Sequence, residues 1–204
     1  MAYIPNDYER TFKIHRDTYN YKGVLAYLKV PSNLHVNMLD DYLIWYVGFD
    51  DNSNNKVEGG ISYTKKYTGS PQFRKFLNYN GIKLYNEPMA TQPSPGDIIK
   101  IKLVKSNSDS YGNCSVSLYI ADNLVTTKSV TINNLVDVKL VHGTEGYPCT
   151  YDDAQFQYAK YQISDGTWYN WTAGYEPVWS TGAKVKNIYV DCRINPMKTY
   201  ASNQ

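Results

Sequence analysis

The sequence lacks the features that mark several large classes of protein. No apolar run approaches the roughly 18 residues of a membrane-spanning helix. Lys and Arg number 21 against 19 Asp and Glu, a formal net charge of +2. This balance gives no electrostatic reason to expect nucleic acid or an anionic membrane as a partner. No amphipathic segment longer than two helical turns stands out, which excludes a helical bundle.

Cysteine is scarce, with only Cys114, Cys149 and Cys192. They lie far apart without the CxxC spacing of a zinc site, so we expect no metal there. An odd number leaves at least one thiol unpaired in a monomer. The sequence is compatible with one disulfide and one free cysteine, and equally with three buried thiols. The first residues show neither the basic nor the apolar segment of a signal peptide. That fits a cytoplasmic protein or a mature domain without its leader.

Tyrosine is the outlier in composition, with 21 of 204 residues against 5 Phe. Together with abundant Asn and Thr, it favours strands and turns over helices. The length and the 42% apolar content suit a single domain over 1–204, with a core and no long disordered tail.

Short apolar segments separated by polar turns run along the chain. In 97–105, isoleucine and leucine alternate with lysine, as in a strand with one buried face. The segment 41–49 is nearly all apolar, which predicts a central strand buried on both faces. About ten such segments predict an all-β fold, a two-sheet antiparallel jelly-roll sandwich. The other expected strands are 22–30, 56–65, 73–77, 82–85, 114–121, 128–132, 136–142, 156–163 and 186–192, with a helical turn as the alternative over 71–77.

The N-terminal segment 1–21 is rich in tyrosine and charge and only weakly periodic. We expect an edge strand or an arm here. Such a strand pairs with a neighbouring copy by β-augmentation, so a homo-oligomer through this segment is one predicted form of assembly.

Four motifs, in their order along the chain, resemble the concanavalin A-like jelly-roll superfamily. WYVGFD (45–50) is followed by a polar turn and by VEGGIS (57–62), and later by PGDII (95–99) and FQYA (156–159). More narrowly, this order resembles the glutamic peptidases (eqolisins) and uncharacterised bacterial secreted relatives of that sandwich. The resemblance covers about residues 22 to 165.

The resemblance implies a catalytic pair from which this chain departs. In eqolisins, a Gln and a Glu on facing strands activate water and stabilise the tetrahedral intermediate. The Gln position is similar to Glu58. The Glu is expected near the end of strand 138–142, but this chain has His142 there, and Glu145 follows beyond Gly143. The resemblance therefore implies the fold more than the chemistry.

Glu58 and Glu145 form the candidate catalytic pair. On one sheet face, with burial splitting their pKa values, they would act as acid and base of a peptidase or a glycosidase. The alternative is that each is a solvated or hydrogen-bonded turn residue. No Ser–His–Asp or Cys–His spacing is readable, so His142 is expected to be structural.

The loop 50–55 places oxygen-bearing side chains at alternating positions, as a calcium loop does. It lacks the central Gly, and the twelfth residue counted from Asp50 is Ile61 rather than Glu. We expect a hydrated hairpin turn and no cofactor, with Ca²⁺ as the weaker alternative.

Aromatic residues cluster between 161 and 179, where three of the four Trp fall within twelve residues. Aromatic rings offer a large apolar area and a polar handle to a sugar, and exposed aromatic clusters usually mark a binding surface. A plug at one end of the sandwich and a protein interface are the alternatives. The predicted ligand-binding residues are Trp168, Tyr169, Trp171, Tyr175 and Trp179.

These observations favour a non-catalytic binding or surface protein of bacterial type, extracellular or at the cell surface, with a glycan as ligand. One rival is a glutamic-peptidase-like or glycoside hydrolase using Glu58 and Glu145. The other is a self-assembling surface or coat protein.

Overall fold

The computed structural model describes residues 7–15, 20–145, 149–172, 178–181, 189–191 and 198–201, with side chains for 20–144 and 149–172. These residues form strands and turns and no helix. None of them therefore belongs to a helix long and apolar enough to cross a membrane.

Two antiparallel sheets make up the protein. In spatial order, the front sheet consists of β7 (Ile82–Pro88), β6 (Gln72–Tyr79), β5 (Lys56–Thr64), β4 (Tyr42–Asp51), β11 (Leu135–Glu145), β1 (Asp7–His15) and β15 (Val178–Thr181). The back sheet consists of β10 (Asn123–Thr131), β9 (Asn113–Ile120), β8 (Ile98–Lys105), β2 (Tyr21–Lys29) and β13 (Ala154–Ile163).

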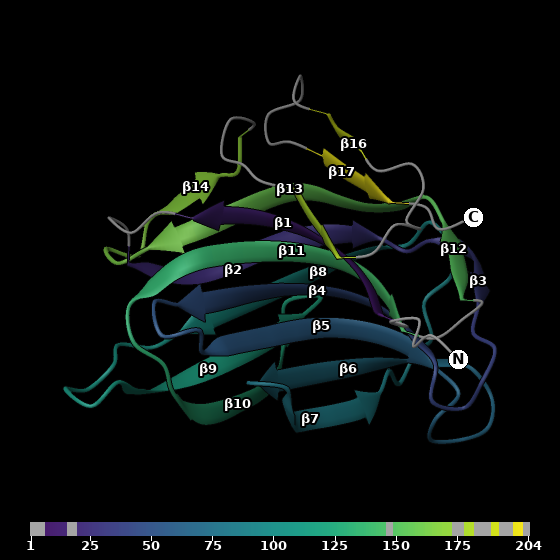
Figure 1. Ribbon diagram of the computed structural model, residues 1–204, viewed down its shortest axis with the longest axis horizontal. Helices are drawn as coiled ribbons and strands as arrows, with labels where there is room; N and C mark the ends of the chain where they lie inside the picture. Colours follow the sequence, from purple (N-terminus) through teal and green to yellow (C-terminus); the bar gives the residue numbers. More distant parts are fainter. Residues whose placement is uncertain are drawn as a thin grey trace, which may run out of the picture.

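Short strands complete the back sheet beyond β13. They are β14 (Trp168–Asn170), β17 (Lys198–Ala201) and β16 (Tyr189–Asp191), and β3 (Ser32–His35) pairs separately with β12 (Thr150–Asp152). The two sheets join at one corner, where Leu135 pairs with Tyr21. Figure 1 looks onto the front sheet, with β8 and β9 packed behind β4 and β5. The predicted two-sheet antiparallel sandwich is confirmed.

Strand β4 is buried on both faces, as its apolar sequence predicts. One set of alternating side chains, which includes Trp45 and Phe49, joins the large core between the sheets. The other set, which includes Ile44 and Tyr46, packs with Phe76 on the outer face of the front sheet. The outer face of this sheet is therefore partly apolar, and not simply a solvated surface.

The strand predicted over 73–77 is confirmed as part of β6. The alternative of a helical turn is excluded, because Phe73 and Leu77 reach the core while Phe76 lies on the outer face. The N-terminal β1 is not a free arm. It pairs with β11 from Asp7 to His15, and β15 covers its other edge between Glu9 and Phe12.

Candidate binding site on the outer face of the front sheet

Three charged side chains meet on the outer face of the front sheet. The Lys139 Nζ atom lies 2.8 Å from Glu58 Oε1 and 2.9 Å from Asp50 Oδ1. The Tyr46 hydroxyl donates a hydrogen bond to Glu58 Oε1 at 3.2 Å. The side chains of Lys139, Asp50 and Glu58 are 7%, 11% and 21% exposed, so this Lys139 cluster is largely shielded from water.

A glycine makes the Lys139 cluster possible. Gly48 in β4 pairs with Lys139 on one side and with Glu58 on the other. A Cβ atom at Gly48 would lie 2.8 Å from Lys139 Cε. Because no side chain stands there, Lys139 lies across β4 and reaches the strand beyond it.

The electrostatics of Lys139 fix its charge. Burial alone lowers the pKa of Lys139, but the nearby carboxylates of Glu58 and Asp50 outweigh it and raise the pKa overall. Lys139 is therefore a permanent cation at neutral pH. The partner of Glu58 is this cation, and two carboxylates share one positive charge.

The structure does not bring the backbone positions of Glu58 and Glu145 together. Glu145 pairs with Tyr42, whereas Glu58 pairs with Gly48 on the same strand β4. Six residues along a strand span about 20 Å. The two carboxyl groups of a glycosidase are about 5–9.5 Å apart. The side chain of Glu145 lies outside the described residues.

A pocket of about 460 Å³ opens on the same face. Its walls include the rings of Tyr42, Tyr67 and Phe76 and the polar side chains of Asn78, Lys83 and Asn86. Asn78 is the register partner of Glu58, so the pocket adjoins the Lys139 cluster. A few polar groups on aromatic walls are typical of a small-molecule site.

Among the residues of the pocket wall, Asn78 has a hydrogen-bonding group that is not satisfied by the described residues. Its side-chain oxygen is buried and has no hydrogen-bond partner within residues 20–144 and 149–172. A buried polar atom without a partner costs free energy, because it has lost water and gained nothing in return. Because Asn78 lines the pocket, turning its amide toward the cavity would let a ligand group supply the missing bond.

His142 belongs to the interior and not to the pocket. Its ring lies 4.7 Å from that of Phe156, and burial lowers its pKa to about 3. This neutral histidine agrees with the expected structural role.

The predicted aromatic cluster is divided between the two sheets. Trp168 is half-buried in β14 of the back sheet, and its neighbour Tyr169 is 42% exposed and stacks on Tyr161. Trp171 is fully buried in the core, a correction to its expected place in a stacking surface, because an interior ring cannot meet a ligand. The backbone of Trp179 pairs with β1 of the front sheet. Tyr175 and the side chain of Trp179 lie outside the described residues.

The loop after β4 is built around Asp51. Its carboxylate accepts hydrogen bonds from the backbone amides of Ser53, Asn55 and Asn133 and from the Asn55 side chain. Burial alone would raise the pKa of Asp51, but these bonds lower it overall. The carboxylate oxygens already have partners, so calcium would have to displace them. Within the described residues, no three His, Cys, Asp or Glu side chains cluster as metal ligands.

Two of the three cysteines, Cys114 and Cys149, are described, and both are buried. Burial raises the pKa of the Cys149 thiol to about 11, which disfavours its reactive thiolate. Cys192 lies outside the described residues.

Comparison with known proteins identifies the architecture. No protein-family model and no curated protein sequence matches the chain. A structure of scytalido-glutamic peptidase with a transition-state analog inhibitor is similar over 95% of this chain and 97% of that one, with TM-score 0.61 and 13% identity. A second structure of that peptidase, with a peptide-based analog, gives 96% and 98% coverage, TM-score 0.58 and 12% identity.

The fold is a concanavalin A-like jelly roll. The expected resemblance is thereby confirmed for the architecture. At 12–13% sequence identity, the similarity to the peptidase structures shows a shared fold and not a shared function.

The residues that build the site were only partly visible in the sequence. Glu58 was singled out, but its partner Lys139 was not, because 81 residues separate them. One signal was available, since Lys139 and Gly48 each stand directly between two apolar residues of the sequence. Asn78 and Tyr67 carry no comparable signal.

Proposed function

We propose that this jelly roll is a non-catalytic saccharide-binding protein that holds its ligand in the pocket on the outer face of the front sheet. The observation that carries the proposal is the buried, unpartnered oxygen of Asn78 in the wall of a pocket that the rings of Tyr42 and Tyr67 also line. Sugars present apolar C–H faces to aromatic rings and hydroxyl groups to amides, which matches such a wall. We place the protein outside the cell, where saccharide polymers are exposed.

The Lys139 cluster argues against the hydrolase alternative. In eqolisins, the pair that activates water joins a Gln to a Glu. Here the Gln position is held by Glu58, and the strand expected to supply the Glu supplies Lys139 instead. A protonated lysine cannot accept a proton from water, so this pair has no general base other than a carboxylate already bonded to a cation.

Strand β14 is the second candidate surface. The ring of Tyr169, which is 42% exposed and stacks on that of Tyr161, offers a small stacking platform. Trp168 precedes it in the strand and therefore points to the opposite face. A ligand there would contact the back sheet and leave the pocket empty.

The experiment compares the two surfaces. Binding of soluble oligosaccharides chosen from a glycan panel is measured by calorimetry for wild type, Tyr67→Ala, Asn78→Ala and Tyr169→Ala, with thermal unfolding as a check on folding. We expect the first two variants to weaken binding at least about tenfold and Tyr169→Ala to leave it unchanged. Loss of binding with Tyr169→Ala alone would move the site to β14.

Three further results would overturn the proposal. Turnover of a saccharide or of casein that Glu58→Gln abolishes would establish a hydrolase. Absence of binding to any saccharide would remove the ligand class. Concentration-dependent assembly in light scattering, without saccharide binding, would favour the coat-protein alternative.

A further inference from the structure

Two cations lie close to the ring of Tyr67, which is part of the pocket wall. The Arg74 guanidinium lies 3.9 Å from the centroid of the Tyr67 ring and hydrogen-bonds to the side-chain and backbone oxygens of Asn86. The Lys83 Nζ atom donates a hydrogen bond to the Tyr67 hydroxyl and lies 5.1 Å from the same ring. The ring of Tyr67 therefore carries a cation on its face and another at its hydroxyl.

Within the part of the chain whose side chains are described, neither cation forms an ion pair. The ion pairs among the described side chains include neither Arg74 nor Lys83. Lys66, a third cation of the pocket wall, pairs with Asp40 at 2.8 Å. Among the described side chains, the two cations around Tyr67 thus have no carboxylate paired with them.

The lack of a paired carboxylate matters most for Arg74, because its side chain is buried. Arg74 is only 6% exposed, and a buried charge without a counter-ion is costly because it has lost most of its hydration. Lys83, by contrast, is exposed and lines the pocket. An anion bound at Lys83 would lie within the field of both cations and would offset that cost.

The face is electrically asymmetric along one row of paired residues. Glu58 pairs with Asn78, and Asn78 pairs with Lys83. The row therefore runs from the acidic Lys139 cluster, in which two carboxylates share one lysine, to the basic end at Lys83. A ligand with one acidic group would bind in a single orientation, with that group at Lys83 and its hydroxyls toward Asn78 and Glu58.

We infer that the ligand is an acidic saccharide, whose carboxylate or sulfate group accepts hydrogen bonds from Lys83 and the Tyr67 hydroxyl while its ring lies against the aromatic wall. This inference rests on the proposed function. It adds the charge of the ligand and the residue that recognises that charge.

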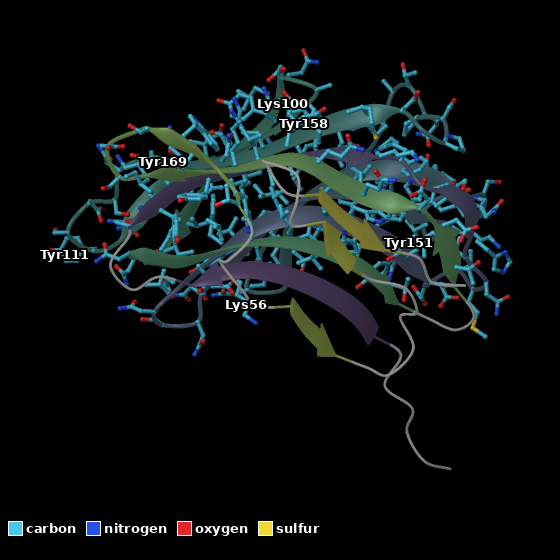
Figure 2. The ribbon with its side chains drawn as sticks, turned by 90° about the horizontal axis from the view of Figure 1, so that it is seen from above. Lys56, Lys100, Tyr111, Tyr151, Tyr158 and Tyr169 are labelled. Carbon is cyan, nitrogen blue, oxygen red and sulfur yellow. The ribbon has the colours of Figure 1, made fainter. Side chains whose placement is uncertain are left out.

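The test uses a pair of ligands that differ only in charge. Tetragalacturonate and its methyl ester are titrated into wild type, Lys83→Met and Lys83→Arg, with a sulfated oligosaccharide as a second anion and polyglutamate as an acidic peptide. Lys100→Met is the matched control, because it removes the same charge from the opposite side of the sandwich. Figure 2 shows Lys100 and Tyr158 on one side and Lys56 on the other.

We expect Lys83→Met to weaken binding of the acidic saccharide at least about tenfold, with Lys83→Arg retaining most of the affinity and Lys100→Met within about twofold of wild type. The methyl ester should bind wild type and Lys83→Met alike. Whether the carboxylated or the sulfated ligand shows this dependence identifies the anion.

The outcomes separate this inference from the proposed function. Equal binding of the acid and its ester, with no effect of Lys83→Met, would overturn the inference and leave a neutral-saccharide protein. Polyglutamate binding as tightly as the saccharide would overturn it in favour of an acidic peptide. Binding of none of these ligands, nor of a neutral panel, would overturn both.

Discussion

Lys139 links three neighbouring strands on the outer face of the front sheet, because its ion pairs join β11 to β4 and β5. Two largely buried carboxylates, Glu58 and Asp50, share its one positive charge. Replacing it with methionine keeps most of the side-chain volume and removes the charge. Because removing one partner of a buried ion pair leaves the other unpaired, we predict that Lys139→Met lowers the free energy of unfolding by roughly 3 kcal/mol.

Urea denaturation of Lys139→Met and of the triple variant with Glu58→Gln and Asp50→Asn tests this prediction. The triple variant should recover part of the loss, since it has no unpaired buried carboxylates. Unchanged stability in Lys139→Met would show that the ion cluster contributes nothing to folding.

His142 makes the stability of the protein depend on pH. Its folded pKa of about 3 lies below its ordinary value of 6.5 because of burial. Below pH 6.5 the unfolded chain takes up a proton that the folded chain does not, so stability falls as pH drops toward about 3, and above pH 6.5 this contribution vanishes. We predict a slope of up to about 1.4 kcal/mol per pH unit within that window.

The check is the difference between wild type and His142→Leu. The unfolding free energy of wild type should fall relative to that of the leucine variant as pH is lowered through this window, because the leucine variant lacks the proton-linked loss. A difference that stays constant with pH would contradict a buried neutral histidine.

At the scale of the element, two glycines determine which side chains meet across the strands. Gly48 lets Lys139 cross β4, and Gly60 lies between the paired positions of Tyr46 and Phe76, whose rings meet edge to face at 6.0 Å. A Cβ at Gly48 would lie 2.8 Å from the Val57 carbonyl oxygen, and one at Gly60 only 2.2 Å from that of Trp45.

We predict that both glycine-to-alanine variants lose stability through overpacking, Gly48→Ala by roughly 1–3 kcal/mol and Gly60→Ala by more. Denaturant midpoints measured side by side test the ranking. If Gly60→Ala were the milder variant, the strand spacing around β5 would have to be looser than described.

The strands themselves were largely predictable from the sequence. Period-two alternation located β8 and β9 to within a residue or two, because one face of each is buried. Element ends were harder. Strand β11 continues through Gly143 to Glu145, since it is paired on both sides by β1 and β4, a tertiary constraint with no local signal.

The site was harder to predict than the strands. A single sequence shows that Glu58 is an acidic residue in an apolar strand, but not that its partner is Lys139, because strand order decides which distant segments become neighbours. The prediction that the aromatic cluster forms one binding surface failed in part for the same reason. Trp171 looked like part of an exposed loop, yet it packs in the core.

At the scale of the whole molecule, β1 is an integral strand. Its nine residues all pair with β11. Deleting residues 1–15 would expose the edge of a central strand, so we predict that the truncated chain aggregates or fails to fold. Circular dichroism and light scattering would show this. A soluble truncated monomer with an unchanged melting temperature would instead support the N-terminal arm expected from the sequence.

The central claim is that the outer-face pocket binds a saccharide without cleaving it. The most direct measurement follows the side-chain amide signal of Asn78 by NMR during titration with tetragalacturonate, with the signal assigned through Asn78→Asp and the ligand checked by mass spectrometry afterwards. The account predicts a saturable shift of that signal and an intact ligand. A silent Asn78 amide at saturating ligand, or a cleaved ligand, would contradict it.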